Sequence, residues 1–243
     1  MNTYKTLSRN KLLLVSAISA SLLLSACSDN DDKPEVVPPT PPAPIVNQVY
    51  TVTVTNLTAN QPMSPITLIA HDDISTWQVG APASLALETI AESGDGSLFS
   101  SMDNVDSVTV GQGILPPGMS ESIELSLMPD DVDSLSILTM LVNTNDAFAG
   151  LNDFSLDSLA INQVMSFRSI AYDAGTEANS EAKGTFPGPA DGGEGFNALR
   201  DDVDRVHAHP GVISQDDGLA DSVLSASHRF DNPVLTIKIE RTQ

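Results

Sequence analysis

Three carboxylates stand beside tight turns in two short stretches of the chain. Residues 143–151 contribute Asp146, and a turn of sequence Asp-Ala-Gly-Thr-Glu contributes Asp173 and Glu177. Hard cations such as Ca²⁺ take six to eight oxygen ligands, so carboxylates from separate segments must be joined by carbonyl groups and water. Gly175 permits a sharp reversal that lets both acids of the turn point at one centre. The pattern predicts one calcium site, with solvated turn acids as the alternative because Asp is abundant here.

Two histidines one residue apart offer a second metal chemistry. On an extended segment, His207 and His209 would face the same way, and two imidazoles could bind Zn²⁺ or Cu²⁺. The alternative is a pair of hydrogen-bonded loop histidines, because no Cys or His-x-x-x-His elsewhere completes a tetrahedral set. The chain also lacks a Gly-x-Ser-x-Gly elbow, a His-Glu-x-x-His motif and a phosphate-binding loop. We therefore expect a binding protein and keep a hydrolase or metalloenzyme that uses the two histidines as the alternative.

A longer pattern links three segments in a fixed order. Asn-Thr-Asn-Asp-Ala-Phe-Ala-Gly-Leu at 143–151 is followed by Tyr-Asp-Ala-Gly-Thr-Glu at 172–177 and then by His-Arg-Phe-Asp-Asn-Pro-Val-Leu-Thr-Ile-Lys-Ile-Glu at 228–240. This order resembles the spondin domain of F-spondin and mindin, and is closer still to its bacterial lipoprotein versions. The resemblance covers roughly residues 48 to 242.

The resemblance implies both a fold and a ligand set. In the family the domain is a C2-like antiparallel β-sandwich, and one calcium ion is held by acids that correspond here to Asp146, Asp173 and Glu177. Animal members have Asp where this chain has Glu177, and an aromatic residue where it has Ala147. The extracellular cysteines of those members are also missing. The resemblance thus implies a structural calcium ion in an adhesion or recognition module.

The chain begins with the pattern of a bacterial lipoprotein. Residues 1–26 combine a positive start, an apolar stretch and small residues before Cys27, which is typical of an export signal and not of a spanning helix. Lipidation of Cys27 would anchor the protein to a membrane without crossing it. Ser28 follows the cysteine in place of Asp, which favours sorting to the outer membrane. Residues 27–47 are rich in Asp and Pro and predict an extended tether that holds the 48–243 domain away from the bilayer.

Charge and cysteine usage limit the function further. The formal net charge is −21, and the export signal holds basic residues but no acidic ones, so its removal leaves a still more negative protein. Such a surface repels phosphate backbones and favours divalent cations, which argues against nucleic acid as a partner. Cys27 is the one cysteine, so the domain has no disulfide, and a sandwich core must stabilise it.

Alternating patterns predict the architecture of the domain. Short runs of β-branched and apolar residues, separated by Gly, Pro, Asn or Asp, indicate an all-β sandwich of about eight strands. Residues 84–93 predict one short helix that ends at Gly94, with Leu87, Ile90 and Ala91 on one stripe. A long Gly- and Pro-rich loop follows from 174 to 200, with Phe186 and Phe196 expected on its exposed side. The predicted strands are 49–56, 65–71, 106–110, 120–127, 135–143, 165–172 and 233–241.

The remaining acids and histidines have ordinary structural interpretations. Asp130 to Asp133 and Asp201 to Asp204 predict solvated or helix-capping turns, and His71 and His228 predict structural hydrogen bonds at strand edges. Taken together, the sequence predicts a lipid-anchored envelope protein that binds Ca²⁺ and recognises a protein or glycan partner. A third ligand converging on both histidines beside a deep pocket would favour the enzyme instead.

Overall fold

The computed structural model describes residues 42–243, so the predicted export signal, Cys27 and most of the tether lie outside the described residues. Residues 44–243 form one compact unit. Within this described part, no helix is long and apolar enough to cross a bilayer.

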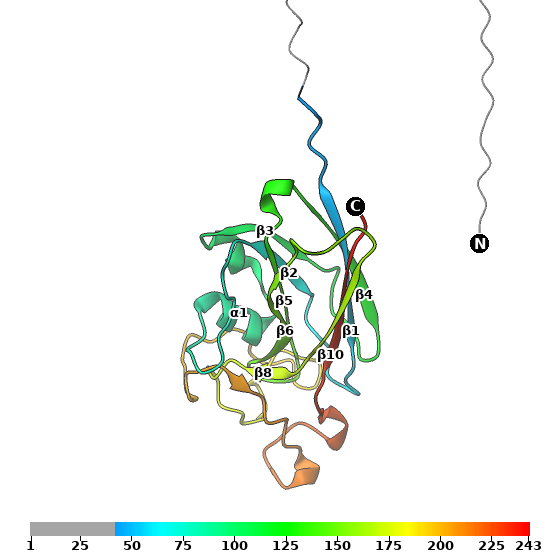
Figure 1. The fold of residues 1–243 in the computed structure, drawn as a ribbon. Helices are drawn as coiled ribbons and strands as arrows, with labels where there is room; N and C mark the ends of the chain where they lie inside the picture. The colour runs from blue at the N-terminus through cyan, green and yellow to red at the C-terminus, as the bar shows by residue number, and fades with distance from the viewer. Residues whose placement is uncertain (1–41) are drawn as a thin grey trace, which may run out of the picture. The chain divides into compact units, whose positions relative to one another are not determined.

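Two antiparallel sheets pack together in the compact unit (Figure 1). One sheet has four strands in the order β4-β1-β10-β7, and the other has six in the order β3-β2-β5-β6-β8-β9. The prediction of an all-β sandwich with one short α-helix is confirmed, with ten strands where about eight were expected. The strands are β1 (Gln48–Asn56), β2 (Thr67–His71), β3 (Val105–Val110), β4 (Ser120–Leu127), β5 (Ser134–Met140), β6 (Ala147–Ser155), β7 (Val164–Ser169), β8 (Ala171–Asp173), β9 (His207–Ala208) and β10 (Leu235–Arg241). The helices are α1 (Leu85–Ser93) and four short 3₁₀ turns, η1 (Ser97–Ser101), η2 (Pro129–Asp131), η3 (Gln215–Asp217) and η4 (Ala226–His228).

The strands of the two sheets differ in how many of their faces are buried, and their burial patterns differ accordingly. In β1 and β4 every second residue is buried, because one face of the four-stranded sheet packs on the main core and the other meets solvent. In β2 and β5 every residue is buried. Their second face is covered by α1 and η1, which join Ile69, Leu138 and Phe148 in a separate apolar cluster. The six-stranded sheet is therefore the middle layer of the domain.

Helix α1 begins and ends as its sequence predicts. The Ser84 hydroxyl accepts a hydrogen bond from the backbone N–H of Leu87 at 3.2 Å, and Gly94 ends the helix in the left-handed conformation at φ 75°. Leu87, Ile90 and Ala91 are fully buried against the sheet, as the predicted stripe requires. This packing fixes the position of two glutamates on the same helix, Glu88 and Glu92.

Three sequence predictions are corrected by the fold. Residues 165–172, expected as one strand, form β7 and β8 in different sheets, because the chain changes sheet at Ile170 and Ala171 N–H donates to Asn232 Oδ1 at 2.8 Å. Residues 147–151, interpreted only as part of the 143–151 ligand segment, begin the long strand β6, which runs to Ser155. Phe186, expected to be exposed, is fully buried in a small cluster of its own with Val212 and Leu224.

Candidate metal centre

The neighbouring strands β6, β8 and β9 bring the predicted ligands to one end of the sheet. Asp146 directly precedes β6, Asp173 is the last residue of β8, and His207 is the first of β9. The register pairs Ala147 with Asp173 and Asp173 with His207. Asp173 therefore lies between the Asp146 segment and the histidine segment. In Figure 1 the turns that follow β8, coloured from yellow to orange-red, gather at this same end of the sandwich.

The turn after β8 reverses sharply, as the sequence predicts. Gly175 has φ 71°, and a Cβ there would lie 2.3 Å from the carbonyl oxygen of Arg205, so no other residue fits without strain. The Gly175 N–H donates to Asp173 Oδ1 at 2.8 Å. Asp146 Oδ2 accepts the backbone N–H groups of Thr176 and Glu177 at 2.8 and 3.2 Å. One oxygen of Asp146 thus holds the turn in place, and its other oxygen is left free.

Unpartnered polar atoms concentrate around this turn. Among the described residues, eleven buried side-chain polar atoms have no hydrogen-bond partner within the protein, and seven of them belong to the turn, the loops that cover it and the two histidines. Buried polar atoms are ordinarily paired, so a cluster of unpaired ones points to a missing ligand. The seven atoms are Asn145 Oδ1, Asp146 Oδ1, Glu177 Oε2, Asn179 Oδ1, Glu181 Oε2, His207 Nδ1 and His209 Nε2.

Burial and repulsion between neighbouring acids raise the pKa values of three carboxyl groups around the turn. Burial, and then the charge of Asp173, raise the pKa of Asp146 to about 7. The pKa of Glu177 rises to about 8 because of burial and then because of Glu92 and other neighbouring acids. Burial, above all, raises the pKa of Glu181 to about 7. Each shift measures a preference for the neutral form that a bound cation would reverse.

Asp173 forms part of a group that could hold a metal ion. One ligand atom each from Asp173, Asp202 and His207 lies within 4.8 Å of the others, and among the described residues this is the group that meets that spacing. Asp173 is fully buried, whereas Asp202 and His207 are partly exposed. Of the predicted calcium set, Asp173 belongs to this group, and Asp146 and Glu177 lie outside it. Asp146 and Glu177 are nevertheless joined through the turn that both help to build.

Asp202 is the residue that sequence reasoning missed. It sits in an acidic run, Asp201 to Asp204, that was interpreted as a solvated turn. In the structure the Asp201 N–H donates to Thr176 O at 3.0 Å and the Asp204 N–H donates to Gly175 O at 2.8 Å. The run therefore lies along the turn after β8. Asp202 is brought to the site by long-range backbone pairing between its segment and the turn, and residue spacing in the sequence does not reveal such pairing.

The two histidines do not act as an equivalent pair. Nδ1 of His207 lies 3.9 Å from Asp173 Oδ1, and Nε2 of His209 lies 3.9 Å from the other oxygen, Oδ2. His209 is buried and packs on Phe230, and burial lowers its pKa to about 4. The backbone N–H of Gly211 donates to His209 Nδ1 at 3.0 Å. The neutral ring must then carry its proton on Nε2, so that atom is a donor and not a metal ligand.

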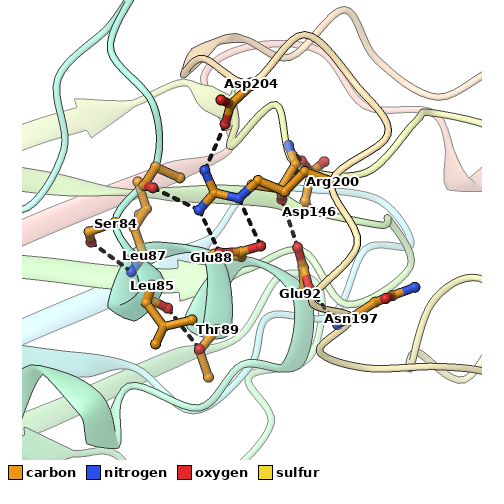
Figure 2. A network of polar contacts seen from close by, with 12 residues as sticks. Ser84, Leu85, Leu87, Glu88, Thr89, Glu92, Asp146, Asn197, Arg200 and Asp204 are labelled. Carbon is orange, nitrogen blue, oxygen red and sulfur yellow. Dashed lines mark hydrogen bonds and ion pairs between the residues drawn. The ribbon is translucent and has the colours of Figure 1, made fainter.

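Helix α1 fastens the covering loop to the site through its two buried glutamates (Figure 2). Glu92 accepts the Thr176 hydroxyl at 2.7 Å with one oxygen and the Asn197 N–H at 2.8 Å with the other. Glu88 forms an ion pair with Arg200, whose Nε donates to Glu88 Oε1 at 3.0 Å.

Arg200 makes two further contacts. It donates to the Ala83 carbonyl at 2.9 Å and to Asp204 at 2.6 Å. Loop 197–204 is therefore held between the helix and the turn.

Two hollows adjoin the carboxylates. A cavity of about 130 Å³ is lined by oxygen-bearing side chains that include Asn145, Glu177, Glu194 and Asp201. A second, of about 310 Å³, lies beside Asn179, Glu181 and Arg229, with Val212 and Ile213 on its apolar side. The first has the composition that a hard cation prefers.

The other sequence predictions for individual residues have mixed outcomes. His71 is buried at the end of β2 and its Nε2 lies 2.8 Å from Ser136 Oγ, which confirms a structural hydrogen bond. His228 lies in η4, where its Nδ1 accepts the Ser225 N–H at 3.0 Å. Asp130 is exposed, and Asp131 and Asp133 are partly exposed, as expected of a solvated turn.

Comparison with known proteins adds no family assignment. No protein-family model matches the chain, and no curated protein matches it at a significant level.

Proposed function

We propose that this chain is a lipid-anchored, calcium-binding recognition module of the bacterial cell envelope, of the spondin-domain kind. Calcium would be a structural ion that orders the loops at the β8 end of the sandwich. Those ordered loops would present the surface that meets a protein or glycan partner.

The observation that carries the proposal is the set of buried, unpaired oxygens at the turn after β8. Asp146 Oδ1, Glu177 Oε2 and Asn145 Oδ1 have no hydrogen-bond partner in the protein. Unpaired buried carboxylates are costly, and a divalent cation offsets that cost while its coordination shell accepts several oxygens. Asp146, Asp173 and Glu177 would hold the ion, with Asn145 as a further oxygen. The ion supplies positive charge where the chain provides only acids and amides.

An ordered loop would give the module its contact surface. Loop 196–203 carries Phe196, Leu199 and Val203, whose side chains are 39, 68 and 44 % exposed. Asn197 and Arg200 tie the same loop to Glu92 of α1 and to Ala83 just before the helix, and Asp201 ties it to the end of the turn. Because large apolar side chains on a positioned loop are a common form of protein contact, cation binding and partner binding would be coupled.

The anchor would be the lipidated Cys27, with residues 28–47 as the tether. Replacement of Cys27 by Ser should move the protein from the membrane fraction of expressing cells to the soluble fraction. A Cys27→Ser protein that still sediments with membranes would contradict a lipid anchor.

The enzyme alternative requires both imidazoles on one metal. Asp202 supplies a third ligand to the group, but His209 Nε2 carries a proton and faces the other oxygen of Asp173. The recognition module is therefore the function we propose.

Thermal unfolding in defined metals tests the proposal. The protein from Ser28 onwards, which retains every described residue, is melted in chelator and then in millimolar Ca²⁺, with Mg²⁺ as the comparison. At an ion concentration about 100 times the Kd, the expected gain is about 2.7 kcal/mol, or roughly 5–10 °C for a domain of this size. No selective rise with Ca²⁺ would contradict the calcium assignment.

A further inference from the structure

We propose that Asp173, Asp202 and His207 form a second metal site, which shares only Asp173 with the proposed calcium site and is selective for a divalent transition metal of the Zn²⁺ class. The site does not rest on the proposed calcium function. It uses a nitrogen ligand, and it lies on the histidine side of Asp173.

The sheet register aims two of the ligands at each other. Asp173 and His207 are partners across β8 and β9, so their side chains project from the same face of the sheet. Asp173 Oδ1 and His207 Nδ1 are 3.9 Å apart. Ligand atoms bound to one Zn²⁺ ion at about 2.1 Å lie roughly 3–4 Å from each other. The two atoms therefore already have a separation that one ion could bridge.

Backbone hydrogen bonds position the third ligand, Asp202. The N–H groups that flank Asp202 in sequence, those of Asp201 and Asp204, donate to the carbonyls of Thr176 and Gly175. These bonds hold the Asp202 segment along the turn that begins at Asp173. Its carboxylate thereby comes within 4.8 Å of the other two ligand atoms. Three distant segments thus converge without any direct hydrogen bond between their ligand atoms.

The ligand types select the metal. Nδ1 of His207 is buried and has no hydrogen-bond partner, so its lone pair is available. An imidazole nitrogen with two carboxylates suits Zn²⁺ and its neighbours in the first transition series, whereas Ca²⁺ and Mg²⁺ take oxygen ligands alone. Three protein ligands leave a fourth position open, and partial exposure of Asp202 and His207 gives that position access to solvent.

His209 acts one step away from the metal, as a positioning residue. In the neutral ring the N–H at Nε2 faces Asp173 Oδ2 at 3.9 Å, and Nδ1 accepts a hydrogen bond from the backbone N–H of Gly211. Asn179 donates to the same Asp173 oxygen at 2.7 Å. These two groups orient the carboxylate so that Oδ1 is directed at His207, and outer contacts of this kind tune metal affinity.

Titration with Co²⁺ tests the site, because its visible absorption reports ligand type directly. The protein from Ser28 onwards is freed of metal with chelator, titrated with Co²⁺, and then back-titrated with Zn²⁺. We expect saturable binding of one Co²⁺ with visible bands that Zn²⁺ removes and that excess Ca²⁺ does not. Absence of such bands would overturn the proposal.

Matched variants separate this site from the calcium site. His207→Ala and Asp202→Asn change partly exposed side chains and should abolish the Co²⁺ bands while the Ca²⁺-dependent rise in Tm persists. Glu177→Gln should do the reverse, and His228→Ala should change neither. His209→Phe keeps an aromatic ring beside Phe230 and should weaken Co²⁺ binding about ten-fold. Unchanged Co²⁺ bands in His207→Ala would overturn the site even if the calcium proposal holds.

Discussion

Buried polar groups differ in their hydrogen bonding between the sandwich and the loop region that spans residues 174–231. Asn56, in the sandwich, donates through Nδ2 to the carbonyls of Gln61 and Leu115, and its Oδ1 accepts from Thr58. Asp146, beneath the loop region, is equally buried, yet one of its oxygens accepts three hydrogen bonds and the other none. Of the eleven unpaired buried polar atoms among the described residues, four lie in the sandwich and seven lie in the loop region or directly beneath it, so the need for a further ligand is concentrated at the loop region.

The acids themselves show the same contrast. Asp131 lies in a cluster of acids at least partly open to solvent, where water stabilises each charge. Asp173 is fully buried beside Asp146 and two histidines. Both places gather several acids, so burial and the neighbouring histidines, and not the number of acids, distinguish the candidate cation site from a solvated surface.

The largest expected effect comes from the sandwich core. Ile237→Ala removes a fully buried side chain from the sandwich core and should lower the free energy of unfolding by about 2–5 kcal/mol. Because the core does not depend on metal, denaturant unfolding should give the same loss in chelator and in Ca²⁺. A loss that appears only with Ca²⁺ would show that the two regions are not independent.

Asp173→Asn should remove the whole metal-dependent gain, about 2.7 kcal/mol at 100 times the Kd. In chelator the variant should be somewhat less stable than the parent, because its amide oxygen can still accept from Gly175 but its NH₂ group replaces the oxygen that accepts from Asn179. The metal-dependent gain is therefore the difference in stability between Ca²⁺ and chelator for each protein. Asp131→Asn is the matched control and should leave the Ca²⁺-dependent Tm unchanged. Equal effects at the two positions would contradict the assignment of the buried acids to a metal.

Arg200→Gln should loosen the covering loop at a cost of about 1–3 kcal/mol, since it leaves Glu88 buried without its partner but Arg200 itself is partly solvated. Hydrogen exchange in residues 197–204 should rise with it. Arg229→Gln breaks the ion pair between Arg229 and Asp217, in which both side chains are more exposed than in the Arg200–Glu88 pair, and should cost much less stability. Similar losses of stability in the Arg200 and Arg229 variants would show that docking of the covering loop on α1 does not contribute to the stability of the domain.

The pH dependence of folding stability in chelator gives a further comparison of the two regions. Asp146, Glu177 and Glu181 have folded-state pKa values above their ordinary ones, so the folded protein binds more protons than the unfolded chain between pH 4.5 and 8. Stability in chelator should therefore fall as pH rises through this window. Excess Ca²⁺ should cancel that fall, because the ion binds the ionised carboxylates.

His71 gives the pH experiment an internal check from the sandwich. Burial, chiefly, lowers its pKa in the folded state, so its contribution should be lost as pH falls below 6.5. A His71→Gln variant should change the profile only below pH 6.5, whereas Glu177→Gln should change it across pH 4.5 to 8 and is the one of the two that acts above pH 6.5. Urea unfolding at pH 5, 6.5 and 8 separates the two.

The parts of the fold that sequence anticipates are those governed by local chemistry. β4 occupies 120–127 as predicted, since its alternation matches a half-buried strand, and Ser84 and Gly94 bound α1 as caps. β6 was missed because its first half is buried on both faces and does not alternate. Asp173 and His207 could be named as candidates from residue type. Asp202 could not, because what brings it to them is backbone pairing between segments that are about thirty residues apart.

The placement of β1 would have a mechanical consequence for the proposed module, with its lipid anchor before β1 and its partner at the loops that follow β8. The chain enters the four-stranded sheet at Gln48, beside the C-terminus, and the loops that follow β8 lie at the opposite end of the sandwich (Figure 1). β1 is flanked on both sides, by β4 and by β10, along almost its entire length. A pull between anchor and partner would run along these strands and load both ladders in shear, so that many hydrogen bonds would have to yield together before the domain could open.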